Sequence, residues 1–305
     1  MLGVLTFLLG APTAFRLLGD HGVNAFVLAA AVVPLVLLPL AGLLVVQVLL
    51  RRRRLAALTA VLVVLNVVWL VPQYVPARVT TGSQLTVLQV NLRFGGGDPF
   101  ALVGMVQRHR VDVLAVQELT PEAVDALRGA GLDRELPFRE VLPGRGPDGA
   151  GLWSRHPLDS LPAWPTRFPA PGAVVKTPGR DVVVRVVHPA PATIAAGAGQ
   201  YRADYATLRR AVERLDPQVA TVLVGDFNAT VDNSELRDLM AGRFRDAAEL
   251  AGDGLQRTWS LRPGWPPLLH LDHVLVDPHF TVRATMVLDL PGSDHEAVIA
   301  RLVLT

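Results

Sequence analysis

The chain has 305 residues, of which 50% are apolar and 18% charged, with a formal net charge of +2 and a mean hydropathy of +0.36. The charged share lies well below the customary quarter, which indicates that part of the chain lies in lipid and excludes a disordered or fibrous protein. Cysteine is absent, which excludes disulfides, thiolate metal sites and a cysteine nucleophile.

Charge is unevenly distributed along the chain. The first 80 residues hold six arginines and one acid, which leaves 23 basic and 26 acidic residues in 81–305. This second part lacks the excess of positive charge that attracts nucleic acid without sequence preference. The balance counts mildly against a dedicated DNA-binding protein.

Two uncharged stretches near the N-terminus are long enough to cross a membrane. Residues 25–49 carry no charge, residues 55–72 carry none either, and four arginines at 51–54 join them. A helix of about 20 apolar residues spans a bilayer, and both stretches lack the polar face of a buried helix in a soluble protein. We predict a transmembrane hairpin with its arginine tip on the cytoplasmic side.

Residues 1–19 are also apolar, although Pro12 and Arg16 weaken them as a third span. A signal peptide is the alternative, disfavoured because the stretch lacks a basic start and a clear cleavage site. If residues 1–19 cross, the loop 20–24 lies outside; with or without this span, everything after residue 72 lies outside. We therefore predict a multi-pass protein of the cell membrane with an extracytoplasmic C-terminal domain. The linker 73–83 reaches at most roughly 40 Å, which holds that domain near the outer leaflet.

Residues 84–305 are enough for one large α/β domain. Apolar runs typical of strands in covered sheets lie at 85–90, 113–116, 182–187 and 221–224. Helical patterns lie at about 100–109, 121–130, 202–215 and 233–241. The later runs 271–276, 281–288 and 297–304 are spaced closely enough to pair antiparallel, and 143–149 and 189–199 are predicted loops.

Polar side chains gather at the ends of these predicted strands or in the turns just beyond them, where loops on a rigid sheet commonly carry function. They are Asn91, Glu118, His188, Asp226, Asn228, Asp272, Asp294 and His295. If these side chains converge on one rim, their oxygen ligands suit Mg²⁺ or Mn²⁺. The absence of cysteine and of an HExxH motif disfavours a zinc protease.

Seven short motifs follow one another through this part of the chain. They are LQVNLRF (88–94), VLAVQEL (113–119), GLWSRHPL (151–158), VVHPAPA (186–192), VLVGDFNAT (222–230), HLDHVLV (270–276) and GSDHEAV (292–298). In this order they resemble the endonuclease/exonuclease/phosphatase family over essentially all of 84–305. The resemblance implies a four-layer α/β sandwich, with two packed β-sheets flanked by helices, and a divalent-metal phosphoesterase. Together with the transmembrane hairpin, the architecture also resembles the VanJ-like membrane proteins associated with glycopeptide resistance.

The resemblance implies a metal site at three of these residues. Glu118 matches the family's metal-binding glutamate, Asn91 matches the asparagine beside it, and Asp294 faces the metal side. We expect Mg²⁺, with Mn²⁺ as an alternative.

The resemblance also implies the residues that act on the phosphate. Asp226 holds or deprotonates the attacking water, and Asn228 donates to a phosphate oxygen. His188 contacts the scissile phosphate, and Asp272 holds the catalytic His295. Either His295 or Asp226 is the general base, and the residues alone leave both open.

Two further histidines depart from this set. His273 follows Asp272 but points to the opposite face of its strand, so we predict a structural role. His270 stands where the family often has arginine, which puts one phosphate or structural contact in doubt.

An outward-facing active site held near lipid favours a phosphate ester or pyrophosphate of a membrane lipid, such as a polyprenyl carrier of cell-wall precursors. Cleavage of extracellular nucleic acid is the alternative with the same chemistry, disfavoured by the slightly acidic domain. A catalytically silent phosphate-binding domain is disfavoured because every expected catalytic position is filled. The sequence points to no particular protein partner.

Overall fold

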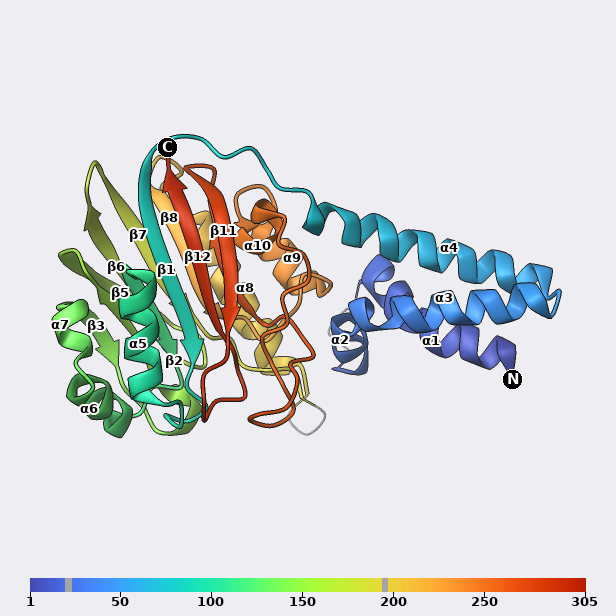
Figure 1. The fold of residues 1–305 in the computed structure, drawn as a ribbon, viewed down its shortest axis with the longest axis horizontal. Helices are drawn as coiled ribbons and strands as arrows, with labels where there is room; N and C mark the ends of the chain where they lie inside the picture. The colour runs from blue at the N-terminus through green and yellow to red at the C-terminus, as the bar shows by residue number, and fades with distance from the viewer. Residues whose placement is uncertain (20–23, 194–196) are drawn as a thin grey trace.

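The computed structural model describes residues 1–19, 24–193 and 197–305. Two packed β-sheets form a sandwich with helices on its outer faces, and the N-terminal helices project from one side of it (Figure 1). Residues 20–23 of the predicted loop 20–24 lie outside the described residues. Residues 194–196 of the predicted loop 189–199 lie outside them as well.

The two sheets share one pairing pattern. Within the described chain, the first sheet has the order β11-β12-β1-β2-β4-β3 and the second β5-β6-β7-β8-β10-β9. In each sheet the third and fourth strands pair in parallel and their neighbours pair antiparallel. The strands of the first sheet are β11 (Phe280–Leu288), β12 (Ala297–Leu304), β1 (Ser83–Asn91), β2 (Val113–Gln117), β4 (Ala150–Ser154) and β3 (Phe138–Leu142). Those of the second are β5 (Leu158–Trp164), β6 (Ala170–Thr177), β7 (Arg180–Val187), β8 (Ala220–Asp226), β10 (Asp272–Val276) and β9 (Arg245–Asp246).

Three apolar layers hold the sandwich together. The layer between the sheets is built from alternate residues of the central strands, such as Val87 of β1 and Val222 of β8. The residues that alternate with them, such as Leu88 and Leu223, point to the outer faces of the sheets and pack under the helices. The helices on the first sheet are α5 (Pro99–His109), α6 (Pro121–Gly129) and α7 (Leu132–Glu135), and those on the second are α8 (Gly199–Glu213) and α9 (Ser234–Met240). Two short helices, η2 (Gly146–Asp148) and α10 (Ala247–Ala251), lie in connections.

Capping residues set where the helices of the first outer layer begin. The Asp98 carboxylate accepts hydrogen bonds from the backbone N–H groups of Phe100 and Ala101 at 2.8 and 3.0 Å. Thr120 Oγ1 accepts one from the N–H of Ala123 at 3.2 Å. A proline follows each cap, where its missing N–H costs nothing. The first turns of α5 and α6 are therefore set locally.

The three later strands do not all pair with one another as the sequence predicts. β11 and β12 pair antiparallel, but β10 lies in the second sheet beside β8. The chain crosses between the sheets at 277–279. Both sheets bury the same alternating apolar pattern, so the spacing of the runs carries no information on which sheet each one joins.

Ahead of β1 the chain is helical, with α1 (Leu2–Leu18), α2 (Asn24–Ala31), α3 (Val33–Leu49), α4 (Arg53–Leu70) and the 3-10 helix η1 (Val71–Tyr74). Among the described residues, Arg53–Tyr74 is the one helix long and apolar enough to cross a bilayer. The predicted span 25–49 is helical but breaks at Val32, where α2 and α3 meet at 69°. Pro34 in the first turn of α3 explains the break, because proline restricts the residue before it and offers no N–H to continue α2.

The segment between η1 and β1 lies against the sandwich. The N–H of Gly254 donates to the carbonyl of Gln73, and the N–H of Ala77 donates to the carbonyl of Leu250, both at 2.8 Å. The predicted linker is therefore partly docked on the domain.

Candidate active site

The predicted site residues meet at one edge of the sandwich. Asn91 ends β1, Glu118 follows β2, His188 follows β7 and Asp226 ends β8. These four strands form the parallel pair at the centre of each sheet, and parallel strands end at the same edge.

The antiparallel neighbours bring the remaining residues to the same edge. Asp272 is the first residue of β10, which runs against β8. Asp294 and His295 precede β12, which runs against β1. Asn228 lies two residues beyond β8. Strand direction alone thus collects residues that are up to 204 positions apart in the chain.

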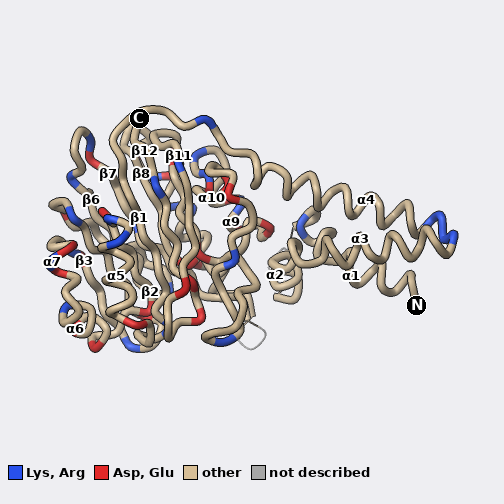
Figure 2. The backbone as a smooth tube through the Cα atoms, in the orientation of Figure 1, with Lys and Arg blue, Asp and Glu red and all other residues tan. Residues whose placement is uncertain are grey.

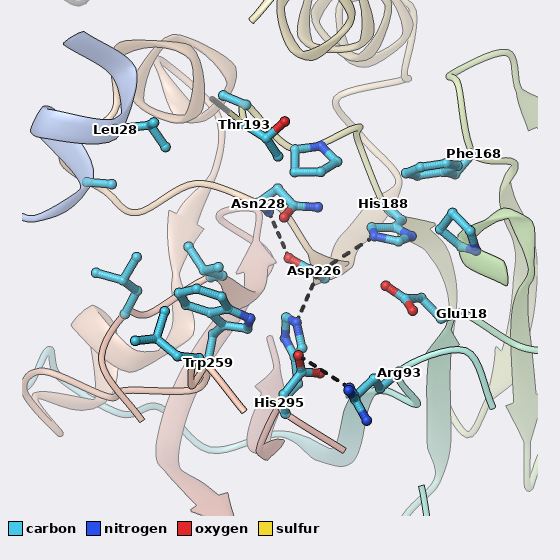
Figure 3. Close-up of a pocket in the computed structure, with 18 of the residues that line it drawn as sticks. Leu28, Arg93, Glu118, Phe168, His188, Thr193, Asp226, Asn228, Trp259 and His295 are labelled. Carbon is cyan, nitrogen blue, oxygen red and sulfur yellow. Dashed lines mark hydrogen bonds and ion pairs between the residues drawn. The ribbon is translucent and has the colours of Figure 1, made fainter. Parts of the chain in front are cut away.

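A cavity of about 680 Å³ opens at this edge. Six of the predicted residues line it, namely Glu118, His188, Asp226, Asn228, Asp294 and His295. Asn91 and Asp272 lie behind them as fully buried partners. Figure 3 shows Asp226 between His188, His295 and Asn228, with Glu118 on one side.

Glu118 is held in a backbone conformation that is rare for a side chain larger than glycine. Its φ of 54° lies in the left-handed region, which turns the chain out of β2. Its Oε1 accepts from Asn91 Nδ2 at 3.1 Å, and its Oε2 accepts from the N–H of Phe94 at 2.8 Å. Burial outweighs these hydrogen bonds and raises the pKa of the Glu118 carboxyl.

Asp226 lies at the centre of the site. Its Oδ2 accepts from Asn91 Nδ2 at 3.1 Å and lies 3.6 Å from His188 Nε2 and 3.7 Å from His295 Nε2. Its Oδ1 accepts from the N–H of Asn228 at 2.8 Å. Burial raises the pKa of Asp226 to about 7, against the lowering effect of His295. One Asn91 nitrogen therefore contacts both Glu118 and Asp226.

His295 and Asp272 form a buried pair. Nδ1 of His295 lies 2.9 Å from Asp272 Oδ2, and Gln89 Nε2 donates to Asp272 Oδ1 at 2.8 Å. Burial would lower the pKa of His295, but Asp272 and then Asp226 raise it to about 10. The same contact lowers the pKa of Asp272, whose burial alone would raise it. Nε2 of His295 is left pointing toward Asp226.

His188 is buried and neutral. Burial, with a smaller effect of His295, lowers its pKa to about 3. Its ring lies against Phe168, with 4.7 Å between centroids. Asn228 donates through Nδ2 to the carbonyl of Pro189 at 3.0 Å, which fixes its amide beside the loop that carries His188.

Three residues of the site were not singled out from the sequence. Arg93 lines the cavity, and its Nε lies 3.7 Å from Asp294 Oδ2. Phe168 forms a wall, and Gln89 holds Asp272. Arg93 stands two positions after Asn91 in a motif, which is a usable signal, whereas Phe168 lies in a segment with no motif.

The donor set fits a divalent cation. Glu118, Asp226 and Asp294 present carboxylates to one cavity, and hard oxygen atoms are what Mg²⁺ and Mn²⁺ prefer. Asp226, Asp272 and His295 also approach closely enough to share an ion. Asp272 is a poor ligand there, because both of its carboxylate oxygens already accept hydrogen bonds. Glu118 is the better candidate, since its half-buried carboxylate lines the cavity.

His273 and His270 lie apart from this cavity. His273 occupies the outer face of β10, where Nδ1 lies 2.5 Å from Asp246 Oδ2 and Nε2 lies 2.9 Å from the Ala229 carbonyl oxygen. Both ring nitrogens thus have partners, which fits the structural role predicted for this residue. The His270 ring lies 4.2 Å from that of His273, and burial lowers the pKa of His270 to about 4.

Comparisons with known proteins agree with this geometry. A family model described as "Endonuclease/Exonuclease/phosphatase family" matches residues 88–295. No curated protein matches the chain.

Solved structures share the fold at low identity. A family protein from Bacteroides thetaiotaomicron has a TM-score of 0.57 and 18% identity, covering 74% of this chain and 100% of its own. A mannosyl-6-phosphatase of the same species has a TM-score of 0.57 and 19% identity over 72% and 100%. D. rerio TDP2, complexed with a single-strand DNA product, has a TM-score of 0.60 and 15% identity over 72% and 99%. These likenesses show the sandwich fold.

Proposed function

The chain belongs to the endonuclease/exonuclease/phosphatase family, and we propose that it hydrolyses a phosphate ester or pyrophosphate of a membrane lipid at an extracytoplasmic active site. Family members are metal-dependent phosphoesterases, nucleases and phosphatases, and this chain is a metal-dependent phosphoric ester hydrolase. We propose the substrate class, the membrane anchor and the VanJ-like character of the protein.

The proposed metal is Mg²⁺, held by Glu118 with Asn91 and Asp294 beside it. A bound divalent cation polarises the phosphate and offsets charge on the leaving group. Asn91 orients the Glu118 carboxylate through its 3.1 Å hydrogen bond. Arg93, 3.7 Å from Asp294, adds a positive charge at the same wall.

The side chains around Asp226 carry out the proposed in-line attack. A water oxygen forms a bond to phosphorus while the bond to the leaving oxygen breaks, and the leaving oxygen takes up a proton. The water's proton passes to Asp226, whose pKa is about 7, or to His295, which accepts it through Nε2 only in its neutral form. Nε2 of His295 lies 3.7 Å from Asp226 Oδ2. Asn228 and His188 face the equatorial phosphate oxygens and stabilise their charge.

The outer surface of the N-terminal helices supports a membrane anchor. Phe7, Leu38 and Val64, on α1, α3 and α4, are 74%, 82% and 59% exposed. An exposed surface of this kind suits lipid rather than water. In Figure 2 the bundle is uncharged along most of its length. With 17 residues, α3 is about 25 Å long, slightly short of the roughly 30 Å bilayer core, a mismatch that bilayer thinning offsets.

The interior of the same bundle contains polar side chains that pair across helices. Gln47 Nε2 donates to Thr6 Oγ1, and Asn66 Nδ2 donates to Thr13 Oγ1, each at 2.8 Å. All four side chains are buried. Polar side chains that bond across helices beneath an apolar surface are typical of membrane bundles.

Charge supports the proposed orientation. Arg51–54 lie at the tip of the bundle opposite the catalytic domain, visible as the blue end in Figure 2. By the positive-inside rule this tip is cytoplasmic, which leaves the domain outside. At the inner end, Arg16 forms an ion pair with Asp232 of the domain.

The observation that carries the lipid proposal is the position of the cavity. Its wall includes Leu28 of α2, an element of the apolar N-terminal segment. A nucleic-acid substrate is the second candidate, given the DNA product held by D. rerio TDP2. It is disfavoured because Arg93 is the sole arginine or lysine among the described cavity-lining residues.

The test is phosphate release by the full-length protein in detergent with Mg²⁺. Polyprenyl pyrophosphate, a phospholipid and plasmid DNA are the substrates, and Asp226→Ala is the inactive control. We expect turnover of a lipid phosphate that chelation abolishes. Cleavage of DNA alone would replace the lipid proposal with a nuclease, and no turnover of any substrate would favour a silent domain.

The general base is assigned by a second measurement. If His295 is the base, His295→Ala removes one limb of the bell-shaped pH dependence of kcat/KM. An unchanged profile assigns the proton to Asp226 instead.

A further inference from the structure

The active-site cavity has two chemically different sides. One side presents Arg93 and Glu118, with Asp294 3.7 Å from Arg93, and the opposite side, which carries Leu28 and Trp259, is largely apolar (Figure 3). The apolar side is lined by residues of α2 and of the segment 259–271 that precedes β10, namely Val27, Leu28, Ala31, Trp259, Leu261, Leu269 and Leu271. In Figure 3, Leu28 and Trp259 lie across Asp226 from Glu118.

Helix α2 is a fixed part of this wall. Val27 is buried with Phe227 and Leu236 in the core under the second sheet. The backbone carbonyl of Val27 accepts a hydrogen bond from Asn233 Nδ2 at 2.8 Å. Asn24 Nδ2, at the start of the helix, donates to the carbonyl of Thr193 at 2.6 Å.

The apolar side offers few hydrogen-bonding groups to a polar substrate. Its polar groups are Thr193, the indole N–H of Trp259 and Asn233. Both ends of the Asn233 amide are engaged, Nδ2 by the Val27 carbonyl and Oδ1 by the N–H of Thr230 at 2.9 Å. Hydroxyl or ring nitrogen atoms placed there would lose their hydrogen bonds to water without replacement. A hydrocarbon chain loses nothing by the same burial.

The bend at Val32 explains how a helix of the apolar N-terminal segment reaches the active site. It turns α2 by 69° from α3, so that α2 lies across the inner end of the bundle, between the bundle and the sandwich (Figure 1). With α3 along the membrane normal, α2 lies close to the membrane plane. The cavity therefore borders the surface where lipid head groups lie.

We propose that α2 is the specificity element of the active site, with Leu28 binding the hydrocarbon chain next to the scissile phosphate. This inference rests on the proposed function and deepens it. The cavity of about 680 Å³ is of a size that holds a whole small-molecule ligand, so it has room for more than the phosphate group. The enzyme thus distinguishes lipid phosphates from water-soluble esters by their chains.

The experiment compares prenyl pyrophosphates of 5 and 15 carbons, which share one head group. The full-length protein in lipid nanodiscs is assayed for phosphate release with Mg²⁺. We expect kcat/KM for the 15-carbon substrate to exceed that for the 5-carbon substrate at least tenfold. Leu28→Trp, which fills the apolar side, should reduce this ratio at least tenfold.

Ala25→Trp is the matched control. Ala25 is on the same helix but is exposed and outside the cavity lining, so the same bulk should leave the ratio as in the wild type. Because Leu28→Trp risks misfolding, Leu28→Ala is measured beside it and should also lower the ratio.

Each outcome has a separate meaning. Turnover of both substrates with no preference for the longer chain, or a ratio that neither Leu28 variant changes, overturns the inference and leaves the phosphoesterase intact. Turnover of neither prenyl pyrophosphate while plasmid DNA is cleaved overturns the lipid proposal itself. A ratio lowered equally by Ala25→Trp assigns the effect to α2 as a whole and removes Leu28 from the role.

Discussion

At the scale of single residues, the contact between Asp272 and His295 sets the state of the imidazole. Asp272→Asn keeps the shape but removes the charge, and the amide favours the wrong tautomer of His295. We expect kcat to fall about 10²- to 10⁴-fold. The pKa of His295 should also fall, because Asp272 is the main group that raises it against burial.

Asp277→Asn is the control that distinguishes a loss of catalysis from a loss of folding. Asp277 lies one residue past the other end of β10, is equally buried, and accepts from the N–H of Thr221 at 2.9 Å. This variant should lose stability without losing kcat per folded molecule. Equal kcat in Asp272→Asn and the wild type would remove Asp272 from catalysis.

The pair of His273 and Asp246 makes stability depend on pH. Burial would lower the pKa of His273, but Asp246 outweighs it and raises that pKa; the pKa of Asp246 is lowered in turn. A raised histidine pKa stabilises the fold below about pH 6.5, and this stabilisation is lost as pH rises through the folded-state pKa. His270, with a pKa of about 4, stays neutral over this window, and Asp272 stays charged.

His273→Gln should therefore cost about 3 kcal/mol at pH 6 and clearly less at pH 9. Thermal unfolding at the two pH values measures the difference. His109→Gln, at a partly exposed position, should change stability by less than about 0.5 kcal/mol at either pH. A cost for His273→Gln that is independent of pH would show that the residue acts by packing alone.

Site residues could be predicted where a polar side chain interrupts an apolar strand pattern. Asn91, Asp226 and Asp272 lie on the faces of their strands that point toward the other sheet, at the positions where the apolar residues of those faces end. All three meet in the structure. Their catalytic roles stay predictions. Phe168 could not be found this way, because an aromatic wall residue from a loop looks like any other core residue in sequence.

At the scale of elements, the close approach of β7 and β8 requires a glycine before Asp226. Gly225 has a φ of 153°, and a Cβ there would lie 2.0 Å from the Val187 carbonyl oxygen. Gly225→Ala should force the strands apart and destabilise the fold by about 2 kcal/mol. Activity should fall as well, since His188 and Asp226 end these strands.

The unfolding midpoint and kcat together test this prediction. A loss of 2 kcal/mol lowers the midpoint of a domain of this size by about 4–8 °C. Gly129→Ala at the end of α6, where a Cβ meets nothing within 4 Å, should leave both quantities unchanged. A Gly225→Ala protein as stable as the wild type would mean that the strands tolerate separation.

Elements of the domain were predicted well where the chain is buried on both faces and poorly elsewhere. The central strands β1, β2, β7 and β8 all lie where apolar runs place them. The edge strands β3 and β5 are partly exposed, and polar pairs, Arg139-Glu140 and Asp159-Ser160, interrupt their apolar residues, so their sequences give no such run. The bend at Val32 was missed because residues 25–49 are apolar throughout, and composition alone does not reveal a change of direction.

At the scale of the whole molecule, the α/β domain and the arginine tip lie at opposite ends of the N-terminal bundle (Figure 2). Local patterns predicted the apolar stretches and the α/β domain separately. The docking between them depends on distant pairs, such as Arg16 with Asp232 and Asn233 with Val27. Such pairs have no signature in a single sequence, because each partner is an ordinary residue in its own segment.

The proposed sidedness has a direct test because no native thiol competes. Gln218→Cys places a thiol on the exposed surface of the sandwich, and Arg52→Cys places one at the tip while three arginines remain. In intact cells a membrane-impermeant maleimide should label Gln218→Cys and should reach Arg52→Cys only after lysis. The opposite pattern would put the cavity on the cytoplasmic side, and labelling of both before lysis would mean that the bundle does not cross the membrane. Labelling of Gln218→Cys alone places α2 at the outer leaflet, where an extracytoplasmic lipid phosphate can reach Asp226.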